Sequence, residues 1–583
     1  MTSFAKTNAY ERLFGRARWA WILIALGLLT HACAVITMPE GGPKDEVPPK
    51  LTKTYPEHEC TGFKGKILQL VFDKEIEVSD IYNKLVVTPK LQKLEGQPSY
   101  TYKVRGNTLR LTLEAPLEEE TTYTFNFNNA IKDITEGNEA EAPTLTFSTG
   151  DQIDTMYVAG QVRHHMNHEP ATEVWVGLYK AEEGPPNYLE SPPDYFTKTD
   201  EKGVYRLDHI SKGKYYIYAS SNRSGELKLD PGVDEYGFLR EPIDVTVAPL
   251  EAINLSILKA DIREFKLQRQ QPQDQYFELN FNKPVVAYTL ALARKTKRFK
   301  KDPTIYSHLI EDEQVIRVYN TFGLLEEDSL EARLTARDVL GTVIEETITL
   351  QFRGGSHKKS SASYKFEPTS GAIIKPAFEG KIQLNKPVKE VLLNQLFFVF
   401  NGQDTVRLQE EDLQFNAQRD VITLKKQLDP KLLKPPKQAP KKKKNKEEEE
   451  EAQKGLVLHL EEGALVTVEK DKNDALRYTY TFRDPKEYST IKGTITTQAP
   501  GFIVQLLDTD YEVIDEVRNE RNYQFKEVVP GNYKLRVLVL QKPEAEWDFG
   551  NILEQREPDP VLLHPEEIEV PPNWEIPGPD FSF

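Results

Sequence analysis

The sequence predicts an all-β protein built from tandem Ig-like and prealbumin-like β-sandwich domains in series. After residue 40, short runs alternate apolar and polar residues with a period of two, as in Lys66–Phe72, Thr108–Leu113 and Tyr123–Phe127. Gly, Pro, Asn and Asp interrupt these runs at intervals of about 8–12 residues, the spacing of strands in sandwiches. Alternation enriched in Tyr, Phe, Val and Thr is typical of strands buried on one face. Many such strands in series favour sandwiches.

Length and composition limit the function classes. The chain has 583 residues, 39% of them hydrophobic, which is enough for about four to six domains at the usual domain size. It contains 75 basic and 91 acidic residues, a net charge of −16, so we expect no nucleic-acid partner. The only cysteines, Cys33 and Cys60, exclude a disulfide-rich scaffold and a zinc cluster made of cysteines alone.

The N-terminal segment predicts export. Residues 1–18 contain four basic residues and one acidic residue, and the apolar run 19–29 follows. Its eleven residues are about half of the roughly 20 that a membrane-spanning helix needs, so a secretory signal over residues 1–32 is favoured. Its end at Ala32-Cys33 resembles the lipobox of bacterial lipoproteins, which implies cleavage before Cys33 and lipid attachment to that residue. The alternatives are an ordinary signal anchor, or a cleaved signal followed by a chance cysteine.

Two internal patterns repeat along the chain. The first is a strand, a Tyr and Phe alternation, an Asp or Asn turn and a closing strand, and its three copies end at Gly150, Phe352 and Phe482. The second is Tyr-x-[Leu/Phe]-x-x-[Ile/Val]-x-x-Gly-x-Tyr, found at Tyr205–Tyr215 and Tyr523–Tyr533. Along the chain the copies follow in the order first, second, first, first and second pattern. We interpret the second pattern as a hairpin that turns at a glycine and directs its tyrosines into the core. The alternative is a ligand platform made of these tyrosines.

These motifs resemble a known family. Residues 33–51 resemble the mature start of lipoproteins from Bacteroidetes-type bacteria, which carry an S-layer-type bacterial Ig-like domain next. Residues 47–150 are similar to that domain, including Phe72-Asp-Lys, Tyr123-Thr-Phe and the closing Phe147-Ser-Thr-Gly. Residues 154–258 resemble prealbumin-like or carboxypeptidase-regulatory-like modules.

The expected organisation follows from the repeats and the resemblance. It comprises a signal peptide (1–32), a tether (33–46), a bacterial Ig-like domain (47–150), a prealbumin-like sandwich (151–258), a divergent Ig-like sandwich (259–353), an Ig-like sandwich with a disordered Lys/Glu insertion at 431–454 (360–485), and a prealbumin-like sandwich with a C-terminal extension (486–583).

The Lys/Glu run is the most unusual segment. It follows three prolines and cannot bury apolar surface, so disorder is expected, as an insertion within a hairpin of the third type-one copy. The candidate interaction residues, for a partner or for anionic lipid headgroups, are Lys441, Lys442, Lys443, Lys444, Glu447, Glu448 and Glu449. A solvated loop that neutralises its own charge is the alternative.

Candidates for metal binding are weak. His164, His165 and His168 are close enough in sequence to bind a transition metal. They lack the Glu of an HExxH site, so an exposed polar turn is the favoured interpretation. The acidic stretch around Asp230, with Glu226, Asp234 and Glu235, is a calcium alternative that does not match EF-hand spacing.

The sequence therefore predicts a protein that is not an enzyme and needs no cofactor, since the GxSxG, P-loop and GxGxxG motifs are absent. We expect a lipid-anchored scaffold or interaction subunit at the outer membrane, facing the periplasm or the cell surface, with an envelope protein as partner. The alternative is a glycan-binding adhesin or polysaccharide-capture accessory, in which Tyr188, Tyr195 and Phe196 stack on sugar rings. The same aromatic residues could instead fix their loop to its own domain.

Overall fold

The structure is a computed structural model of the chain. It describes residues 45–583 except 93, 182–183, 223–226, 295–303, 311, 354–360, 403, 433–455 and 484. Almost every regular element in these residues is a strand, which confirms the predicted all-β class. The helices among them are short, and none combines the length and apolar character needed to cross a membrane. The predicted signal peptide, Cys33, Glu226 and the run 441–451 lie outside the described residues.

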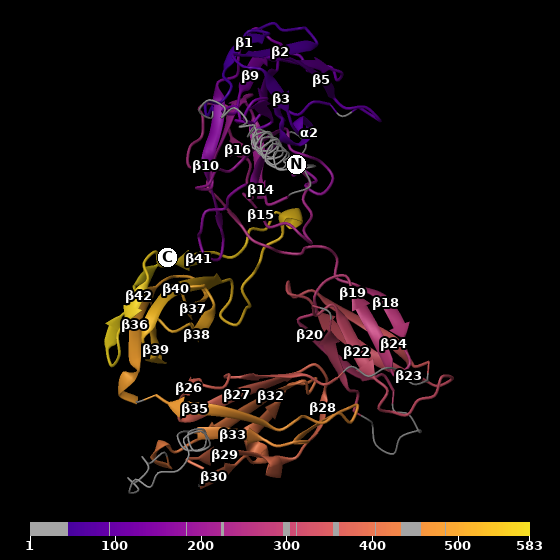
Figure 1. Ribbon diagram of the computed structural model, residues 1–583, viewed down its shortest axis with the longest axis vertical. Helices are drawn as coiled ribbons and strands as arrows, with labels where there is room; N and C mark the ends of the chain where they lie inside the picture. The colour runs from indigo at the N-terminus through magenta and orange to yellow at the C-terminus, as the bar shows by residue number, and fades with distance from the viewer. Residues whose placement is uncertain are drawn as a thin grey trace, which may run out of the picture.

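Five hydrophobic cores define five β-sandwich domains: domain 1 (45–150), domain 2 (151–258), domain 3 (259–353), domain 4 (361–483) and domain 5 (485–583). Each of these cores takes its buried residues from one of the five ranges expected from the sequence. Domain 1 lies at one end of the molecule, domain 2 follows it, and domains 3, 4 and 5 form the other end (Figure 1).

Domains 1, 3 and 4 carry the first repeated pattern. The elements of domain 1 are β1 (Leu51–Tyr55), β2 (Ile67–Phe72), β3 (Ile76–Val78), α2 (Ile81–Lys84), β4 (Val86–Thr88), β5 (Tyr100–Arg105), β6 (Thr108–Leu113), β7 (Thr122–Asn126), β8 (Ile131–Asp133) and β9 (Thr144–Ser148). Those of domain 3 are β18 (Leu267–Pro272), β19 (Tyr276–Phe281), β20 (Ala287–Leu292), β21 (Ser307–Ile310), β22 (Val315–Tyr319), β23 (Ser329–Arg337) and β24 (Val343–Gln351). Those of domain 4 are β25 (Tyr364–Glu367), β26 (Ile373–Ile374), β27 (Ala377–Leu384), β28 (Val388–Val391), η1 (Leu393–Gln395), β29 (Leu396–Phe400), β30 (Asp404–Arg407), η2 (Glu410–Asp412), β31 (Leu413–Phe415), β32 (Val421–Gln427), η3 (Pro430–Leu432), β33 (Leu456–Leu460), β34 (Leu465–Thr467) and β35 (Leu476–Phe482).

Each of these three domains contains a four-stranded sheet with the same strand order. Its strand order is β1-β2-β6-β5 in domain 1, β18-β19-β22-β21 in domain 3 and β25-β27-β32-β31 in domain 4. In the inner strands β2, β6, β19 and β27 alternate residues are buried, because each sheet packs one face on its own core. In domain 4, β32 belongs to this sheet whereas β33 belongs to the opposite one. The segment that contains the Lys/Glu run thus connects two sheets, and its predicted position within a hairpin is wrong.

Domains 2 and 5 carry the second pattern. The elements of domain 2 are β10 (Met156–His164), β11 (Trp175–Lys180), β12 (Tyr195–Lys198), β13 (Val204–Ile210), β14 (Lys214–Ser220), β15 (Tyr236–Phe238), β16 (Ile243–Asp244) and β17 (Leu255–Ile257). Those of domain 5 are η4 (Pro485–Glu487), β36 (Ser489–Thr496), β37 (Gly501–Leu507), β38 (Val513–Arg518), β39 (Asn522–Val528), β40 (Gly531–Leu540), η5 (Ile552–Glu554), β41 (Val561–Leu563), β42 (Ile568–Val570), β43 (Glu575–Pro577) and β44 (Phe581–Ser582).

The repeated tyrosines make equivalent bonds in both domains. The hydroxyls of Tyr205 and Tyr523 donate to the carbonyls of Ile253 (2.6 Å) and Pro579 (2.7 Å). The second tyrosine of each pattern donates to the carbonyl four residues earlier, at 2.8 Å for Tyr215 and 2.7 Å in the other copy. All four rings are buried, so they belong to the cores and offer no platform for a ligand.

The predicted hairpin is wrong. Strand β13 pairs with β10, and β14 pairs with β11 in the opposite sheet, so the turn at Gly213 carries the chain from one sheet to the other. Domain 5 repeats this arrangement with β39 on β36 and β40 on β37. Alternation reports which side of a strand is buried. It does not distinguish two strands that pair from two that face each other across a core.

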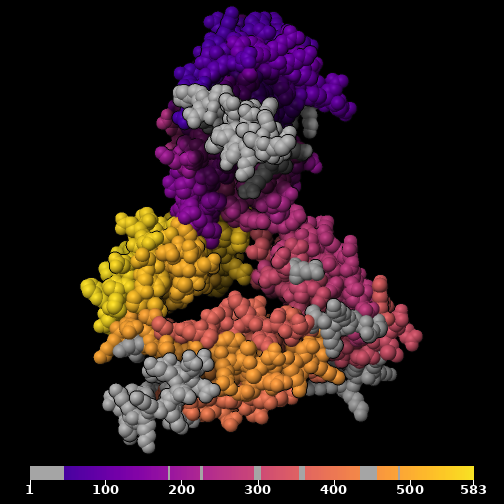
Figure 2. Space-filling view, viewed as in Figure 1, coloured from indigo at the N-terminus to yellow at the C-terminus, as the bar shows by residue number. Residues whose placement is uncertain are grey.

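The last domain returns to the second one, so domains 2, 3, 4 and 5 form a closed ring. Domain 3 contacts domain 4 through the Tyr276 hydroxyl, which donates to Glu469 Oε1 (2.8 Å). Domain 4 contacts domain 5 through Lys375 and Glu527, whose charged atoms are 3.0 Å apart. Domain 5 contacts domain 2 through the site described next. Figure 2 shows an opening between domains 3, 4 and 5 of the ring.

Candidate functional site

The contact between domains 2 and 5 brings together most of the unusual residues. It is built by residues 541–560, which leave β40 and re-enter the sheet at β41. Ile552 of this segment is completely buried among Tyr188, Tyr218 and Leu229 of domain 2, and Leu340 of domain 3 packs against the same cluster. A second cluster joins Leu540 and Val561 of domain 5 to Met166 of domain 2. The two domains therefore share apolar surface, although about 390 residues separate the segments in contact.

The three histidines belong to this contact. His165 Nε2 lies 2.9 Å from the Asp559 carbonyl, and His168 Nε2 lies 3.1 Å from the carbonyl of Val561. A carbonyl oxygen only accepts, so each Nε2 carries a proton, and His165 Nδ1 accepts from the Ser256 hydroxyl at 2.7 Å. Burial lowers the pKa of both imidazoles.

His164 points elsewhere, with Nδ1 3.1 Å from a Glu235 carboxylate oxygen. The predicted exposed turn is therefore wrong for His165 and His168, whose side chains form hydrogen bonds to backbone carbonyls of domain 5. Residues nearly 400 positions away bury them, which no local pattern reveals. Among the described residues, no group of three His, Cys, Asp or Glu side chains could hold a metal ion.

Charged groups in the contact are satisfied internally. The Arg536 guanidinium donates to Gln505 Oε1 through Nε (3.0 Å) and Nη2 (2.7 Å), and to the Met166 carbonyl through Nη1 (3.0 Å). Burial lowers the pKa of Arg536, and burial raises the pKa of Asp559, which accepts from Gln541 Nε2. At the rim, Arg337 of domain 3 pairs with Glu546 at 2.9 Å. These bonds fix the orientation of domain 5 relative to domains 2 and 3.

Ile552→Asp should release domain 5 from domain 2. A carboxylate placed in the fully buried Ile552 position would be unpaired among tyrosine rings, at a cost of several kcal/mol. We expect small-angle X-ray scattering to record a larger radius of gyration for this variant. Leu553→Asp is the matched control, because that neighbouring side chain is 49% exposed and should leave the ring closed. Equal radii for the two variants would show that this contact does not hold the ring.

The aromatic residues proposed for glycan stacking are core residues. Tyr188, Tyr195 and Phe196 are 0%, 2% and 9% exposed. The Tyr188 ring packs edge-on against Tyr179 at 5.3 Å, Phe196 packs against Trp175 at 5.8 Å, and burial raises the pKa of Tyr188 to about 12. These rings have no free face for a sugar, so the stacking hypothesis is wrong for these three residues. They fix their loop to its own domain, which was the stated alternative.

The described carboxylates of the acidic stretch are used in the fold. Asp234 Oδ2 accepts from the Asn222 amide (3.0 Å) and from the Asp230 backbone nitrogen (2.8 Å). Asp230 Oδ1 accepts from the Gly232 nitrogen at 3.0 Å, and Glu235 faces His164. The arrangement is a hydrogen-bonded loop that shapes the domain 2 surface beside Ile552.

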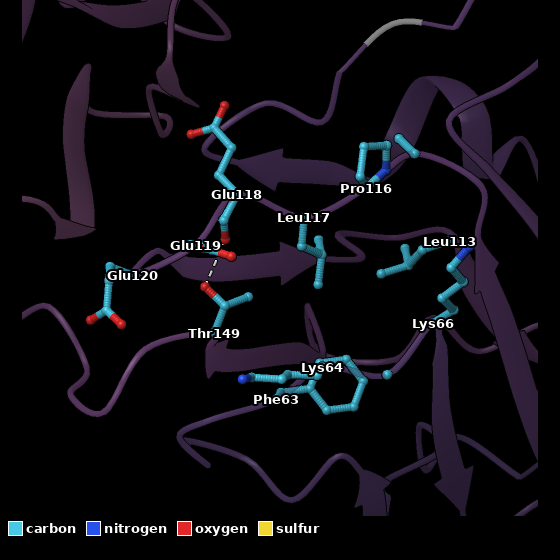
Figure 3. Close-up of a pocket in the computed structure, with 12 residues that line it drawn as sticks. Phe63, Lys64, Lys66, Leu113, Pro116, Leu117, Glu118, Glu119, Glu120 and Thr149 are labelled. Carbon is cyan, nitrogen blue, oxygen red and sulfur yellow. Dashed lines mark hydrogen bonds between the residues drawn. The ribbon is translucent and has the colours of Figure 1, made fainter.

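A separate hollow of about 380 Å³ lies in domain 1. Phe63, Leu113 and Leu117 form its apolar wall, while Glu118 and Glu120 point away from it (Figure 3). Lys64, Lys66 and Thr149 also line it, and the Thr149 hydroxyl donates to the Glu118 carbonyl at 2.7 Å. The hollow thus combines apolar and charged side chains.

Two buried lysines were missed at the level of sequence. Lys283 pairs with Asp338 at 2.6 Å, and Lys386 pairs with Glu469 at 2.6 Å and with Asp471 at 2.7 Å. Both lysine side chains are at most 2% exposed. The signal is present, because Phe281-Asn-Lys-Pro and Leu384-Asn-Lys-Pro repeat the Phe72-Asp-Lys motif. Ile552 had no such signal.

Residues 45–149 match the model of the bacterial Ig-like domain, so domain 1 is an Ig-like domain. No curated protein matches the chain. Among solved structures, the N-terminal part of the bacterial S-layer protein SbsC is 16% identical over 36% of this chain and 44% of its own, with a TM-score of 0.13. The major pilin subunit of Bacillus cereus is 10% identical over 74% and 99% of the two chains, with a TM-score of 0.12. The Bacillus anthracis TIE protein is 9% identical over 94% and 75%, with a TM-score of 0.13. The chain thus spans less than half of the first of these.

Proposed function

We propose that this chain is a non-catalytic, lipid-anchored protein of the bacterial cell envelope, acting as a rigid scaffold or interaction subunit at the outer membrane. The observation that carries the proposal is the ring of domains 2 to 5, closed by Ile552, His165 and His168. The Ig-like domain 1 and the lipobox-like end of the N-terminal segment support it.

The closed ring of domains 2 to 5 supports a scaffold role because it limits the motion of the domains relative to one another. Domains joined only by linkers move relative to one another by default. Here contacts join domain 3 to domain 4, domain 4 to domain 5 and domain 5 to domain 2, which restricts how far their outer loops can move relative to one another. A partner that contacts two domains at once would then lose little orientational freedom on binding.

Lipid attachment is tested at Cys33. We expect an alkyne-labelled fatty acid fed to the producing bacteria to label the chain and the protein to fractionate with the outer membrane. Cys33→Ala should lose both properties, since the lipid chains are the proposed anchor. Cys60→Ala, which removes the other cysteine, should keep them. Label that persists in the Cys33→Ala protein would contradict the anchor.

The scaffold role has its own test. The tagged chain and its Cys33→Ala version are purified in mild detergent, and the proteins that accompany them are identified by mass spectrometry. The proposal expects one stoichiometric envelope protein with the wild type that is lost from the variant. No partner in either sample would contradict a scaffold.

A further inference from the structure

The outer face of the β1-β2-β6-β5 sheet in domain 1 is cationic. In register, Lys103 on β5 lies opposite Arg110 on β6, and the same row continues through Gln69 to Tyr55. The next row runs from Arg105 through Thr108 and Val71 to Lys53. All four basic side chains are exposed, and the outward positions of the four strands contain no Asp or Glu. The nearest carboxylates lie at the rim, where Glu114 accepts from Thr101 and Glu75 lies beside Gly106.

These cations are not neutralised within the described protein. No ion pair or side-chain hydrogen bond involves Lys53, Lys103, Arg105 or Arg110 among the described residues. Like charges directly opposite each other across two strands destabilise a sheet. The pairing of Lys103 with Arg110 therefore weakens the isolated domain, and an anion on this face would remove the repulsion.

The equivalent sheets of the other copies provide an internal comparison. In domain 4, Lys425 pairs with Glu379 (3.4 Å) and Lys365 pairs with Glu367 (2.6 Å). In domain 3, Arg317 pairs with Glu278 at 2.6 Å. Each of these sheets pairs cations on its outward side with carboxylates, exposed in domain 4 and partly buried in domain 3. The same fold therefore does not require an all-cationic face, and the charge of the first copy is a property of domain 1.

The face also lies where an anchored chain would meet a membrane. Figure 1 places β1, β2 and β5 at the end of the molecule away from the ring, while β4 and β7 are on the side that contacts β12 and β13 of domain 2. The twelve residues 33–44 reach at most about 40 Å when extended. A lipid on Cys33 would thus keep domain 1 close to the bilayer.

We propose that this cationic face binds the anionic headgroups of a membrane surface. Lipid phosphates supply the missing negative charge in a plane, which matches an open sheet face. Tyr55, 56% exposed in the same row, suits the boundary between water and lipid. The acidic remainder of the chain does not oppose this contact, because charges are screened beyond about 8 Å at physiological salt. The argument from proximity rests on the proposed attachment at Cys33, whereas the charge argument does not.

The test measures binding to vesicles. The chain from Cys33 onward, produced without lipid, is sedimented with phosphatidylcholine vesicles and with vesicles of phosphatidylcholine and phosphatidylglycerol in equal parts, at about 0.1 M salt. We expect binding to the anionic vesicles only. Each basic residue near such a surface changes the partition about fivefold, so Lys103→Gln/Arg110→Gln should weaken binding roughly 25-fold.

Lys381→Gln/Lys425→Gln, on the equivalent sheet of domain 4, is the matched control and should bind like the wild type. Thermal unfolding of domain 1 in Lys103→Gln/Arg110→Gln should be unchanged or raised, which separates lost binding from lost folding. Equal binding to neutral vesicles, equal weakening by both double variants, or binding to DNA but not to vesicles would overturn the proposal. Because the assay uses chain without lipid, its failure leaves the labelling test of Cys33 standing, and the reverse also holds.

Discussion

Lys386→Met should lower the free energy of unfolding of domain 4 by about 3–5 kcal/mol, the usual cost of removing one partner from a buried ion pair. The ammonium of Lys386 is 1% exposed and lies 2.6 Å from Glu469 and 2.7 Å from Asp471. Methionine fills the space but leaves the Glu469 carboxylate, 7% exposed, and the Asp471 carboxylate, 26% exposed, without their cation. Hydrogen exchange measured by mass spectrometry on β27 and β32 reports the change, since it reads the stability of one domain within a larger chain.

A surface lysine of the same domain sets the scale for this effect. Lys425 pairs with Glu379 but is 50% exposed, so Lys425→Met should cost less than about 1 kcal/mol. Adding Glu469→Gln and Asp471→Asn to Lys386→Met removes the uncompensated charges and should recover part of the loss. If Lys386→Met and Lys425→Met change the rate of hydrogen exchange in β27 and β32 equally, the buried ion pair is not important for the stability of domain 4.

Acid should destabilise domain 3 through His308. This side chain on β21 is 3% exposed, and its ring stacks on Tyr319 at 5.6 Å. Its pKa is lowered to about 4, chiefly by burial and then by Arg317, which lies directly opposite on β22; Lys386 acts in the same direction and Glu469 against it. Between pH 6.5 and 4 the unfolded chain binds a proton at this histidine and the folded chain does not. Stability therefore falls as pH drops through that range, by roughly 3 kcal/mol in all.

His308→Phe keeps a ring against Tyr319 and removes the titration. Urea unfolding can be monitored by hydrogen exchange in β21 and β22. We expect the stability of this variant to fall less than that of the wild type between pH 6.5 and 4. Above pH 7 the histidine is neutral in both the folded and the unfolded chain, so the stability of the two proteins should no longer differ in its dependence on pH. Parallel pH profiles for wild type and variant would contradict a role for His308.

Alternation predicts the strands well because burial on one face is a local property of each strand. Lys66–Phe72 and Thr108–Leu113 are strands over nearly their whole length, and the repeated tyrosines are buried as expected. What alternation does not determine is the neighbour of each strand. Gly213 turns between two sheets because both strands it joins face the same core from opposite sides.

The candidate site was the least predictable part, for a related reason. His165, His168 and Tyr188 each looked like features of an exposed loop, because their own neighbours in sequence are polar or proline-rich. His165 and His168 are covered by Asp559 and Val561 of domain 5, and Tyr188 lies in one cluster with Tyr179 of its own domain and Ile552. No local pattern encodes the contacts between segments so far apart. The buried lysines had a partial signal in their shared Asn-Lys-Pro motif, but the related Lys74 is 26% exposed, so the motif alone does not predict burial.

The return of domain 5 to domain 2 also has a mechanical consequence. Tension applied between domain 1 and domain 5 does not stretch the chain in sequence order. It passes from domain 2 to domain 5 directly through the contact at Ile552, so domains 3 and 4 carry little of the tension while the contact holds. Only after this contact breaks would the force reach them and extend the molecule by their length. Breaking the contact would therefore lengthen the molecule without unfolding any sandwich.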